Sequence, residues 1–315
     1  MRALTTRDNM QTILGAGGII GTELAKSLPN YTDRIRLVSR NPKKVNLTDD
    51  LVSADLLDAV QTLHAVQGSE VVYLTVGLPY NIKTWQSQWP IVVQNVIDAC
   101  KKQNARLVFF DNVYAYGRVN GWMTENTALN PSSKKGEVRK KIADMLREEV
   151  AGGKLKAIIA RAADFYGPNT PLSVVNIMVF GNFKKGEKAL WLINDKVKHS
   201  LTYTPDAGKA TAMLGNTESA YNQVWHLPTD RNVLTGKEFI ERVAAEFKLS
   251  PRYRVLPRWM VQMAGFFNGN VRESVEMLYQ NDSDYLFDCS KFDKAFDFKA
   301  TSYSQGIQET VKSMK

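Results

Sequence analysis

Cysteine and histidine are scarce in this chain of 315 residues, and their scarcity excludes several kinds of site. The two cysteines, Cys100 and Cys289, lie in unrelated segments, so we expect free thiols in a reducing cytoplasm rather than a disulfide framework. The three histidines, His64, His199 and His226, are equally scattered, and we interpret each as structural. Because no cluster has the ligand spacing of a zinc site, we predict no metal.

Long apolar runs are also missing. No stretch approaches the roughly 18 to 20 apolar residues that span a bilayer. Residues 1–9 lack the apolar core of a signal peptide. We therefore expect a cytoplasmic protein with no membrane partner. A hydrophobic content of 44% with 23% charged residues is typical of a folded globular chain and excludes general disorder.

Acidic residues are outnumbered, with 32 against 41 lysines and arginines and a net charge of +9. The basic residues gather at 134–141 and at 184–209. Solvated helix and loop faces are the plainer explanation. The alternative is attraction of an anionic ligand such as a phosphorylated cofactor or a nucleotide substrate. No nucleic-acid-binding module is recognisable, so no such partner is expected.

A glycine-rich stretch, residues 15–21 with the sequence GAGGIIG, stands out against these absences. The preceding residues 10–14 have the length and apolar content of a buried strand. Ile20, Leu24 and Leu28 then recur every four residues, as on one face of a helix. Strand, glycine loop and helix in this order are typical of a dinucleotide-binding motif.

Each glycine of this loop has a physical reason to be there. Gly15 would turn tightly, Gly18 would leave room for a pyrophosphate, and Gly21 would let the helix pack close to the strand. The amides at the helix N-terminus would face the anion. The alternative is a plain turn between a strand and a helix.

The second predicted strand, residues 34–39, ends beside Arg40. An enzyme that prefers NAD usually has Asp or Glu at this place to hold the ribose hydroxyls. Here Ser39 and Arg40 stand there instead, and an arginine pairs with the extra phosphate of NADP. The sequence therefore favours NADP over NAD, although Arg40 could simply face solvent.

Strands and helices alternate through the first half of the chain. We predict strands near 51–56, 71–77, 106–110 and 156–160, with helices at 85–102 and 135–150 and Pro90 in a first helical turn. This alternation predicts an α/β fold, a doubly wound parallel sheet of the Rossmann type. Asp55 and Leu56 would then lie near the adenine, and Thr75 and Val76 would pass under the cofactor.

The alternation loosens beyond Pro168. We expect an NAD(P)-binding domain over residues 1–165, with returns to it near 199–227. Residues 166–198 and 228–315 would then form mainly a smaller, C-terminal substrate lobe. Thr235 and Glu238 predict a capping box at the start of one helix of this lobe.

The ordered motifs resemble the extended short-chain dehydrogenase/reductases, specifically the NAD-dependent epimerase/dehydratase family. The resemblance covers nearly the whole chain from Met10, and it is carried by Gly15-x-x-Gly18-x-x-Gly21, Asp55-Leu56, the helix at 95–100, Tyr116-Gly117, 165–168 and 203–206. It implies reversible hydride transfer at a hydroxyl-bearing carbon of a small molecule, often a nucleotide sugar. It also implies a homodimer through the helices at 85–102 and 135–150.

The residues predicted to contact the cofactor follow from the loop, the strand ends and this resemblance. They are Gly15, Gly18, Ile20, Gly21, Arg40, Asp55, Leu56, Thr75, Val76, Arg139 and Phe165.

The catalytic positions depart from the family's pattern. The resemblance implies a Ser or Thr after the fifth strand and a Tyr-x-x-x-Lys pair on the next helix. Residues four apart share a helix face, so the lysine can lower the pKa of the tyrosine. This chain has no Tyr-x-x-x-Lys, and alignment places Asn112, Lys135 and Arg139 at the three positions.

These replacements leave three interpretations open. In the first, Asn112 binds the substrate oxygen, Arg139 holds the cofactor ribose, and Lys135 is the acid/base group, its charged form disfavoured by Arg139 and partial burial. In the second, a phenol enters the site from Tyr114, Tyr116 or Tyr166. In the third, the two basic residues are an ordinary basic helix start.

Two functions follow, and they belong to different classes. The first is an NAD(P)-dependent oxidoreductase or epimerase/dehydratase with a non-standard acid/base pair. The second is a catalytically silent protein that binds NADP as a redox signal or a structural ligand. We favour the enzyme, because the fold would bring a complete substrate cleft with it.

Overall fold

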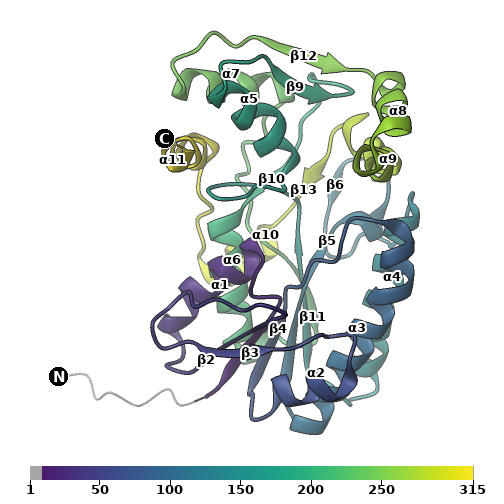
Figure 1. Cartoon of the computed structure of the whole chain (residues 1–315), viewed down its shortest axis with the longest axis vertical. Coiled ribbons are helices and arrows are strands. Elements are labelled where there is room, and N and C mark those ends of the chain that lie inside the picture. Colours follow the sequence, from purple (N-terminus) through teal and green to yellow (C-terminus); the bar gives the residue numbers. More distant parts are fainter. Residues whose placement is uncertain (1–8, 315) are drawn as a thin grey trace, which may run out of the picture.

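The computed structural model describes residues 9–314, and a seven-stranded parallel sheet forms its base (Figure 1). The strand order is β11-β7-β5-β4-β1-β2-β3. The strands are β1 (Gln11–Leu14), β2 (Ile35–Ser39), β3 (Asp50–Ser53), β4 (Val71–Leu74), β5 (Arg106–Asn112), β7 (Ala157–Ala162) and β11 (Gln223–His226). The order reverses between β1 and β4, where doubly wound sheets bind ligands.

Helices cover both faces of this sheet, as the predicted fold class requires. Alternate residues of β4 serve the two faces: Val72 and Leu74 pack toward the α2–α4 side, Val71 and Tyr73 toward the α1–α6 side. One face carries α1 (Ile19–Ser27) and α6 (Thr204–Gly215). The other carries α2 (Ala59–Val66), α3 (Ile82–Gln103) and α4 (Lys134–Ala151). The α/β prediction is thereby confirmed.

Helix α3 corrects the prediction about Pro90. The helix begins at Ile82, three residues earlier than predicted, because the Asn81 side chain accepts a hydrogen bond from the amide of Thr84 and caps it. Pro90 is therefore inside the helix and not in its first turn. Its missing amide removes one helical hydrogen bond, while the buried Trp85 and Trp89 anchor the helix to the sheet.

The two segments predicted to return to the main domain pair with different partners. Strand β11 joins the central sheet beside β7. Strand β10 (Leu201–Tyr203) pairs instead with β8 (Asp164–Tyr166), outside that sheet. Helix α6 then packs on α1, and Asp206 accepts hydrogen bonds from the amide and hydroxyl of Thr301.

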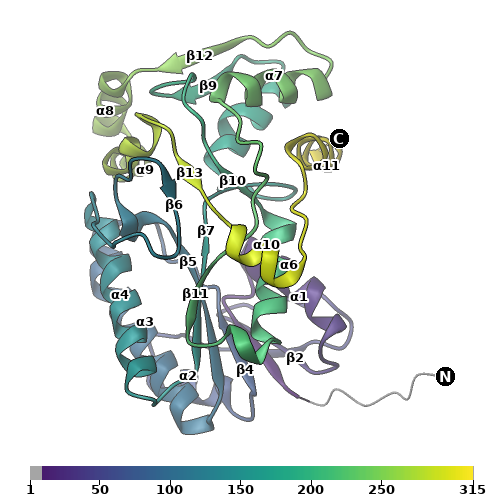
Figure 2. The same ribbon diagram turned by 180° about the vertical axis from the view of Figure 1, so that it is seen from behind.

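A smaller set of elements lies above the carboxyl ends of the sheet strands (Figures 1 and 2). We call it the upper lobe: η3 (Asn176–Phe180), α5 (Gly181–Lys184), β9 (Ala189–Leu192), α7 (Gly236–Glu246), β12 (Tyr253–Leu256), α8 (Arg258–Phe267), α9 (Gly269–Ser274) and α11 (Tyr303–Met314). Its core is aromatic, with Tyr166, Phe180, Phe239 and Tyr303 buried together. The predicted capping box of Thr235 and Glu238 is confirmed at the start of α7.

A segment that we call the strap, residues 275–289, connects the upper lobe back to the sheet. It contains η5 (Val275–Asn281) and β13 (Leu286–Phe287), which pairs with β6 (Trp122–Met123). Helix α10 (Ser290–Phe296) follows it, and the short helices η1 (Leu28–Asn30), η2 (Tyr114–Tyr116) and η4 (Glu218–Ala220) complete the elements. Within residues 9–314 no helix has the length and apolarity to cross a membrane. The domain boundary at residue 165 stays a prediction.

Candidate active site

The glycine loop lies at the point where the strand order reverses. Gly15 has a φ of +100°, and a Cβ built on it would be 2.4 Å from the Cα of Val76, at the end of the neighbouring strand β4. A Cβ on Gly21 would be 2.8 Å from the carbonyl oxygen of Gly15. The turn and the close approach of helix to strand therefore both require glycine.

Gly18 differs from these two glycines because its outer side is open. It is exposed, and the nearest atom to a Cβ there is the Gly15 carbonyl oxygen at 3.5 Å. Helix α1 starts immediately after it, so the free amides of the first turn surround this space. Ile20 contributes only its backbone, since its side chain is buried in the core. The loop fits a pyrophosphate.

The other predicted cofactor contacts line the carboxyl edge of the sheet. Arg40 is exposed at the end of β2, and its carbonyl accepts a hydrogen bond from Ser53. Asp55 is exposed, whereas Leu56 is buried and its carbonyl accepts from Asn95. Thr75 and Val76 are half-buried beside Gly15, and Phe165 packs against Phe110 with ring centroids 5.9 Å apart.

Asn112 and Tyr114 meet at the end of β5. The side-chain oxygen of Asn112 accepts a hydrogen bond of 3.1 Å from the amide of Tyr114, which turns the chain into η2. Tyr114 stacks on Trp85, and its hydroxyl is 3.5 Å from that of Tyr80. Tyr116 lies elsewhere: its hydroxyl is 2.7 Å from Nε2 of His226, in a fully buried contact. Asn112 and Tyr114 are thus brought together and Tyr116 is separated from them.

Lys135 is completely buried, and its ammonium group is fully engaged. Nζ donates to Oε2 and the carbonyl oxygen of Glu273 and to Oε1 of Glu276, each at 2.8 Å, and lies over the ring of Tyr80. The expected neighbour was Arg139, but the real neighbours are two carboxylates from the upper lobe and the strap. That expectation is corrected, because helix spacing could not show what covers the helix start.

Arg139 also has a partner that the sequence did not predict. It donates to Asp111 on β5 at 2.8 Å, and its guanidinium lies 4.7 Å from the centre of the Trp89 ring. Asp111 has no exposed surface on its side chain and also accepts from Arg161 on β7 at 2.9 Å. Arg139 is therefore part of a buried Arg–Asp–Arg cluster. Its proposed contact with the cofactor ribose stays a prediction.

Burial opposes ionisation of the phenols that were considered as bases. It raises the pKa of Tyr114 well above that of a free phenol, and it also raises the pKa of Tyr116. Burial also raises the pKa of Tyr166 well above that of a free phenol, and this side chain lies in the core of the upper lobe. A phenol without a nearby free cation is a hydrogen-bond donor and not a base at neutral pH.

Sequence reasoning missed an acidic residue at this edge. Asp164 follows β7 with one residue between them, and its Oδ2 is 2.9 Å from Nε2 of His199. The side chain of Asp164 is 38% exposed, that of His199 only 6%. A signal did exist, because a carboxylate directly after a central parallel strand stands where such folds do chemistry. Glu273 and Glu276 had no comparable signal.

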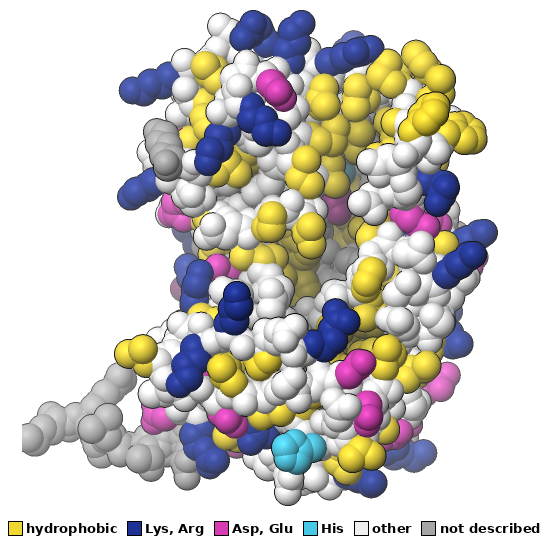
Figure 3. Space-filling model, in the orientation of Figure 1, with side chains coloured by type: hydrophobic (Ala, Val, Ile, Leu, Met, Phe, Trp, Pro, Cys, Tyr) yellow, Lys and Arg dark blue, Asp and Glu magenta, His cyan; other side chains and the backbone are white. Residues whose placement is uncertain are grey.

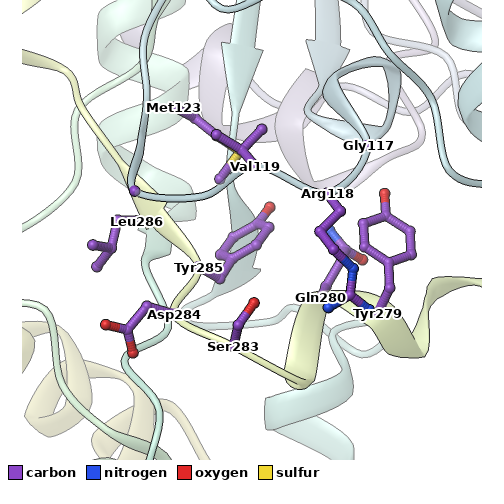
Figure 4. Close-up of a pocket in the computed structure, with 11 residues that line it drawn as sticks. Gly117, Arg118, Val119, Met123, Tyr279, Gln280, Ser283, Asp284, Tyr285 and Leu286 are labelled. Atoms are coloured by element: carbon purple, nitrogen blue, oxygen red, sulfur yellow. The ribbon is translucent and has the colours of Figure 1, made fainter.

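A hollow separates the sheet from the upper lobe, and hydrophobic side chains line much of it (Figure 3). A smaller pocket lies between the loop after η2 and the strap, where Val119 and Met123 face Tyr279, Gln280 and Tyr285 (Figure 4). It contains none of the predicted site residues. The edge with Asn112, Tyr114 and Asp164 is the candidate active site.

A sequence profile of the NAD dependent epimerase/dehydratase family matches residues 12–225. No curated protein sequence matches significantly.

Solved structures with a similar fold are numerous. A UDP-glucuronic acid 4-epimerase from Bacillus cereus, in complex with NAD, superposes with a TM-score of 0.79 at 15% identity and covers 97% of this chain and 98% of its own. A UDP-glucose 4-epimerase from Thermus thermophilus with NAD has a TM-score of 0.77 at 16% identity, and the match covers 97% of this chain and 99% of that protein. A dTDP-glucose 4,6-dehydratase from Streptomyces venezuelae, also with NAD, has a TM-score of 0.78 at 15% identity, and the match covers 96% of each chain. At such identities the likeness shows the fold alone.

Proposed function

Since the chain belongs to the NAD-dependent epimerase/dehydratase family, we propose that it binds a nicotinamide dinucleotide along residues 15–21 and acts on a nucleotide sugar. The observation that carries this proposal is the glycine loop at the switch point, where Gly15 contacts Val76 and Gly18 is left open. Bound there, the dinucleotide supplies an acceptor and donor of hydride. The reaction class is reversible oxidation at a hydroxyl-bearing carbon.

The substrate class is supported by the hollow above the sheet and by the similar structures. Those structures include enzymes named for UDP-glucuronic acid, UDP-glucose and dTDP-glucose. In this chain Asn112 would hydrogen-bond the substrate oxygen, since its NH₂ group has no partner within residues 9–314 while its oxygen accepts from the Tyr114 amide. Tyr114, as a neutral phenol, would donate to a second oxygen.

Arg40 supports the finer proposal that the dinucleotide is NADP. It is exposed at the end of β2, directly after the half-buried Ser39. Ser39 lies near the loop, with its Oγ 3.9 Å from a Cβ built on Gly17. No carboxylate occupies these two positions, so nothing there repels a 2′-phosphate.

The test is to titrate the purified protein with NAD and NADP by calorimetry. The loaded protein is then incubated with UDP-glucose, UDP-glucuronic acid, UDP-N-acetylglucosamine and dTDP-glucose. We expect micromolar binding of a dinucleotide and conversion of at least one sugar nucleotide, detected by chromatography. Absence of dinucleotide binding would overturn the proposal.

A second candidate, a silent dinucleotide-binding protein, is favoured by one observation. Lys135 and Arg139, at the positions of the usual tyrosine and lysine, are both buried in ion pairs. Dinucleotide binding without conversion of any of the four sugar nucleotides would select this candidate. A homodimer through α3 and α4 stays a prediction for either function.

A further inference from the structure

Asp164 and His199 form a side-chain pair at the carboxyl edge of the sheet that neither the family pattern nor the predicted residues include. Oδ2 of Asp164 accepts the hydrogen bond from Nε2 of His199 at 2.9 Å. The other oxygen, Oδ1, has no hydrogen-bond partner within residues 9–314. The pair therefore leaves one carboxylate oxygen available to a ligand while His199 holds the other.

The surroundings of His199 determine which nitrogen carries its hydrogen. A carboxylate oxygen only accepts, so Nε2 must donate. Nδ1 is buried and has no partner in the described part of the chain. The imidazole ring of His199 stacks on the ring of Tyr285, with 4.4 Å between the ring centroids and an interplanar angle of 13°. The imidazole is thus fixed by stacking and can orient the carboxylate.

Four phenols lie within electrostatic range of the Asp164 carboxylate. Asp164 acts electrostatically on Tyr80, Tyr114, Tyr279 and Tyr285, which come from the loop after β4, from η2 and from the strap. Burial is the main cause that raises the pKa of each, and the Asp164 carboxylate raises it further. These side chains are therefore neutral phenols. Tyr80 is exposed and Tyr114 is half-buried, so these two can donate hydrogen bonds to a hydroxyl-rich ligand such as a sugar.

Other ionisable groups near this edge are already engaged. Lys135 is held by Glu273 and Glu276, and Arg139 is held by Asp111. Asp164, by contrast, keeps more than a third of its side chain exposed, and its Oδ1 has no hydrogen-bond partner in the described part of the chain. It is the group here that can receive a proton from a bound ligand.

We propose that Asp164 accepts the proton of the sugar hydroxyl that is oxidised, and that His199 positions it. This inference rests on the proposed function and extends it. The O–H bond would break and its electron pair would form the C=O bond, while the hydrogen on the same carbon would leave as hydride to a bound, oxidised nicotinamide dinucleotide. The proton passes to Oδ1 of Asp164. In the reverse reaction, Asp164 would return the proton and the reduced dinucleotide would return the hydride.

The experiment compares Asp164→Asn with the wild type, on whichever of the four sugar nucleotides named above the wild type converts. We expect kcat to fall about 100-fold or more, the contribution of a general base. Affinity for the same sugar nucleotide, measured by calorimetry with NADH or NADPH bound, should change less than about threefold, because the amide oxygen can keep the bond from His199 while the NH₂ group donates to the substrate oxygen. Asp144→Asn, on the surface of α4, is the matched control.

His199 gives a second, independent pair of variants. His199→Leu removes the donor and should lower kcat about tenfold with KM little changed, the usual effect of a supporting hydrogen bond. His199→Gln keeps an amide donor and should recover most of the loss. A purely structural role would instead make both variants lose stability and activity together.

The outcomes separate this inference from the proposed function. A wild type that binds no dinucleotide, or converts none of the four sugar nucleotides, overturns the enzymatic proposal and this inference with it. A wild type that converts one of them while Asp164→Asn does so equally well overturns this inference alone. Loss of turnover in Asp164→Asn with retained affinity for both ligands supports it.

Discussion

The Nζ atom of Lys135 on α4 lies 2.8 Å from Oε2 of Glu273 on α9, so an ion pair joins the start of a sheet-covering helix to the upper lobe. Glu273 also accepts from the amide of Ile82 at the start of α3, and Glu276 accepts from the amide of Lys134. The two carboxylates therefore accept hydrogen bonds from free backbone amides in the first turns of two helices, and they neutralise one buried ammonium group.

Loss of Lys135 should destabilise the fold. Lys135→Met leaves Glu273 and Glu276 without their cation, and we expect the free energy of unfolding to fall by about 2 to 4 kcal/mol in urea denaturation. Lys140→Met is the control on the same helix. Its pair with Asp144 is exposed, so a change below about 1 kcal/mol is expected.

Glu273→Gln separates the structural role of Lys135 from a catalytic one. If the lysine serves the ion pair, Lys135→Met and Glu273→Gln should reduce activity in proportion to the stability each loses. Turnover abolished by Lys135→Met but kept by Glu273→Gln would instead identify Lys135 as an acid/base group.

Gly18→Ala should weaken dinucleotide binding without unfolding the protein. A Cβ at Gly18 has no neighbour closer than 3.5 Å, but it enters the space expected for the pyrophosphate. We expect stability within about 0.5 kcal/mol of the wild type and a dinucleotide Kd at least about tenfold higher by calorimetry.

Two neighbouring glycines serve as controls for this variant. Gly17→Ala meets only the Ser39 hydroxyl at 3.9 Å and should leave stability unchanged. Gly15→Ala, with φ of +100° and Val76 at 2.4 Å, should cost about 3 kcal/mol or more. Equal dinucleotide affinity in Gly18→Ala and the wild type would remove the pyrophosphate from this loop.

Arg40→Asp should change cofactor preference. The exposed guanidinium would be replaced by a carboxylate that repels a 2′-phosphate, so we expect NADP affinity to fall about 100-fold and NAD affinity to change little. Lys43→Asp makes the same change of charge in the next exposed loop and should alter neither affinity. An equal loss of NAD and NADP in Arg40→Asp would reject the preference for NADP.

His226 makes stability depend on pH. Nδ1 donates to the carbonyl oxygen of Asp288, Nε2 accepts from Tyr116, and burial lowers the pKa of the imidazole to about 3. In the unfolded chain the imidazole of His226 is half-protonated near pH 6.5, whereas in the folded chain it stays neutral at that pH. The stabilising contribution of the neutral imidazole is therefore fully present above pH 6.5. It should fall by up to about 1.4 kcal/mol per unit as the pH drops from 6 toward 4.

Denaturant unfolding at several pH values measures this slope. His226→Gln should lose the contribution of the buried imidazole, and its stability should depend less on pH over the same range. His64→Gln, at an exposed position on α2, should keep the wild-type slope. A slope unchanged in His226→Gln would assign the dependence to carboxylates.

Asp111→Asn should be among the most destabilising single changes. It leaves the buried guanidinium groups of Arg139 and Arg161 without their shared charge, which typically costs about 3 to 5 kcal/mol. Asp50→Asn removes the half-exposed partner of Arg36 and should cost less than about 1 kcal/mol in the same thermal or urea denaturation.

The sequence by itself determined the α/β fold and the site of the glycine loop. These features depend on local patterns: apolar runs with the length of a strand, apolar residues four apart, and glycines at fixed spacing. Such patterns reflect backbone conformation and burial, which neighbouring residues dictate. Strands β1 to β5 and β7 of the central sheet and helices α1, α3 and α4 therefore appear close to their predicted positions, whereas Pro90 was assigned to the wrong turn of α3.

Only the tertiary structure decided which side chains share the catalytic edge. Lys135 meets Glu273 across 138 positions of sequence, and Asp164 meets His199 across 35. These contacts arise because the upper lobe and the strap close over the sheet, and their charges are balanced only after that packing. Helix periodicity places Lys135 and Arg139 on one face of α4, but the partners that engage each cation come from other elements.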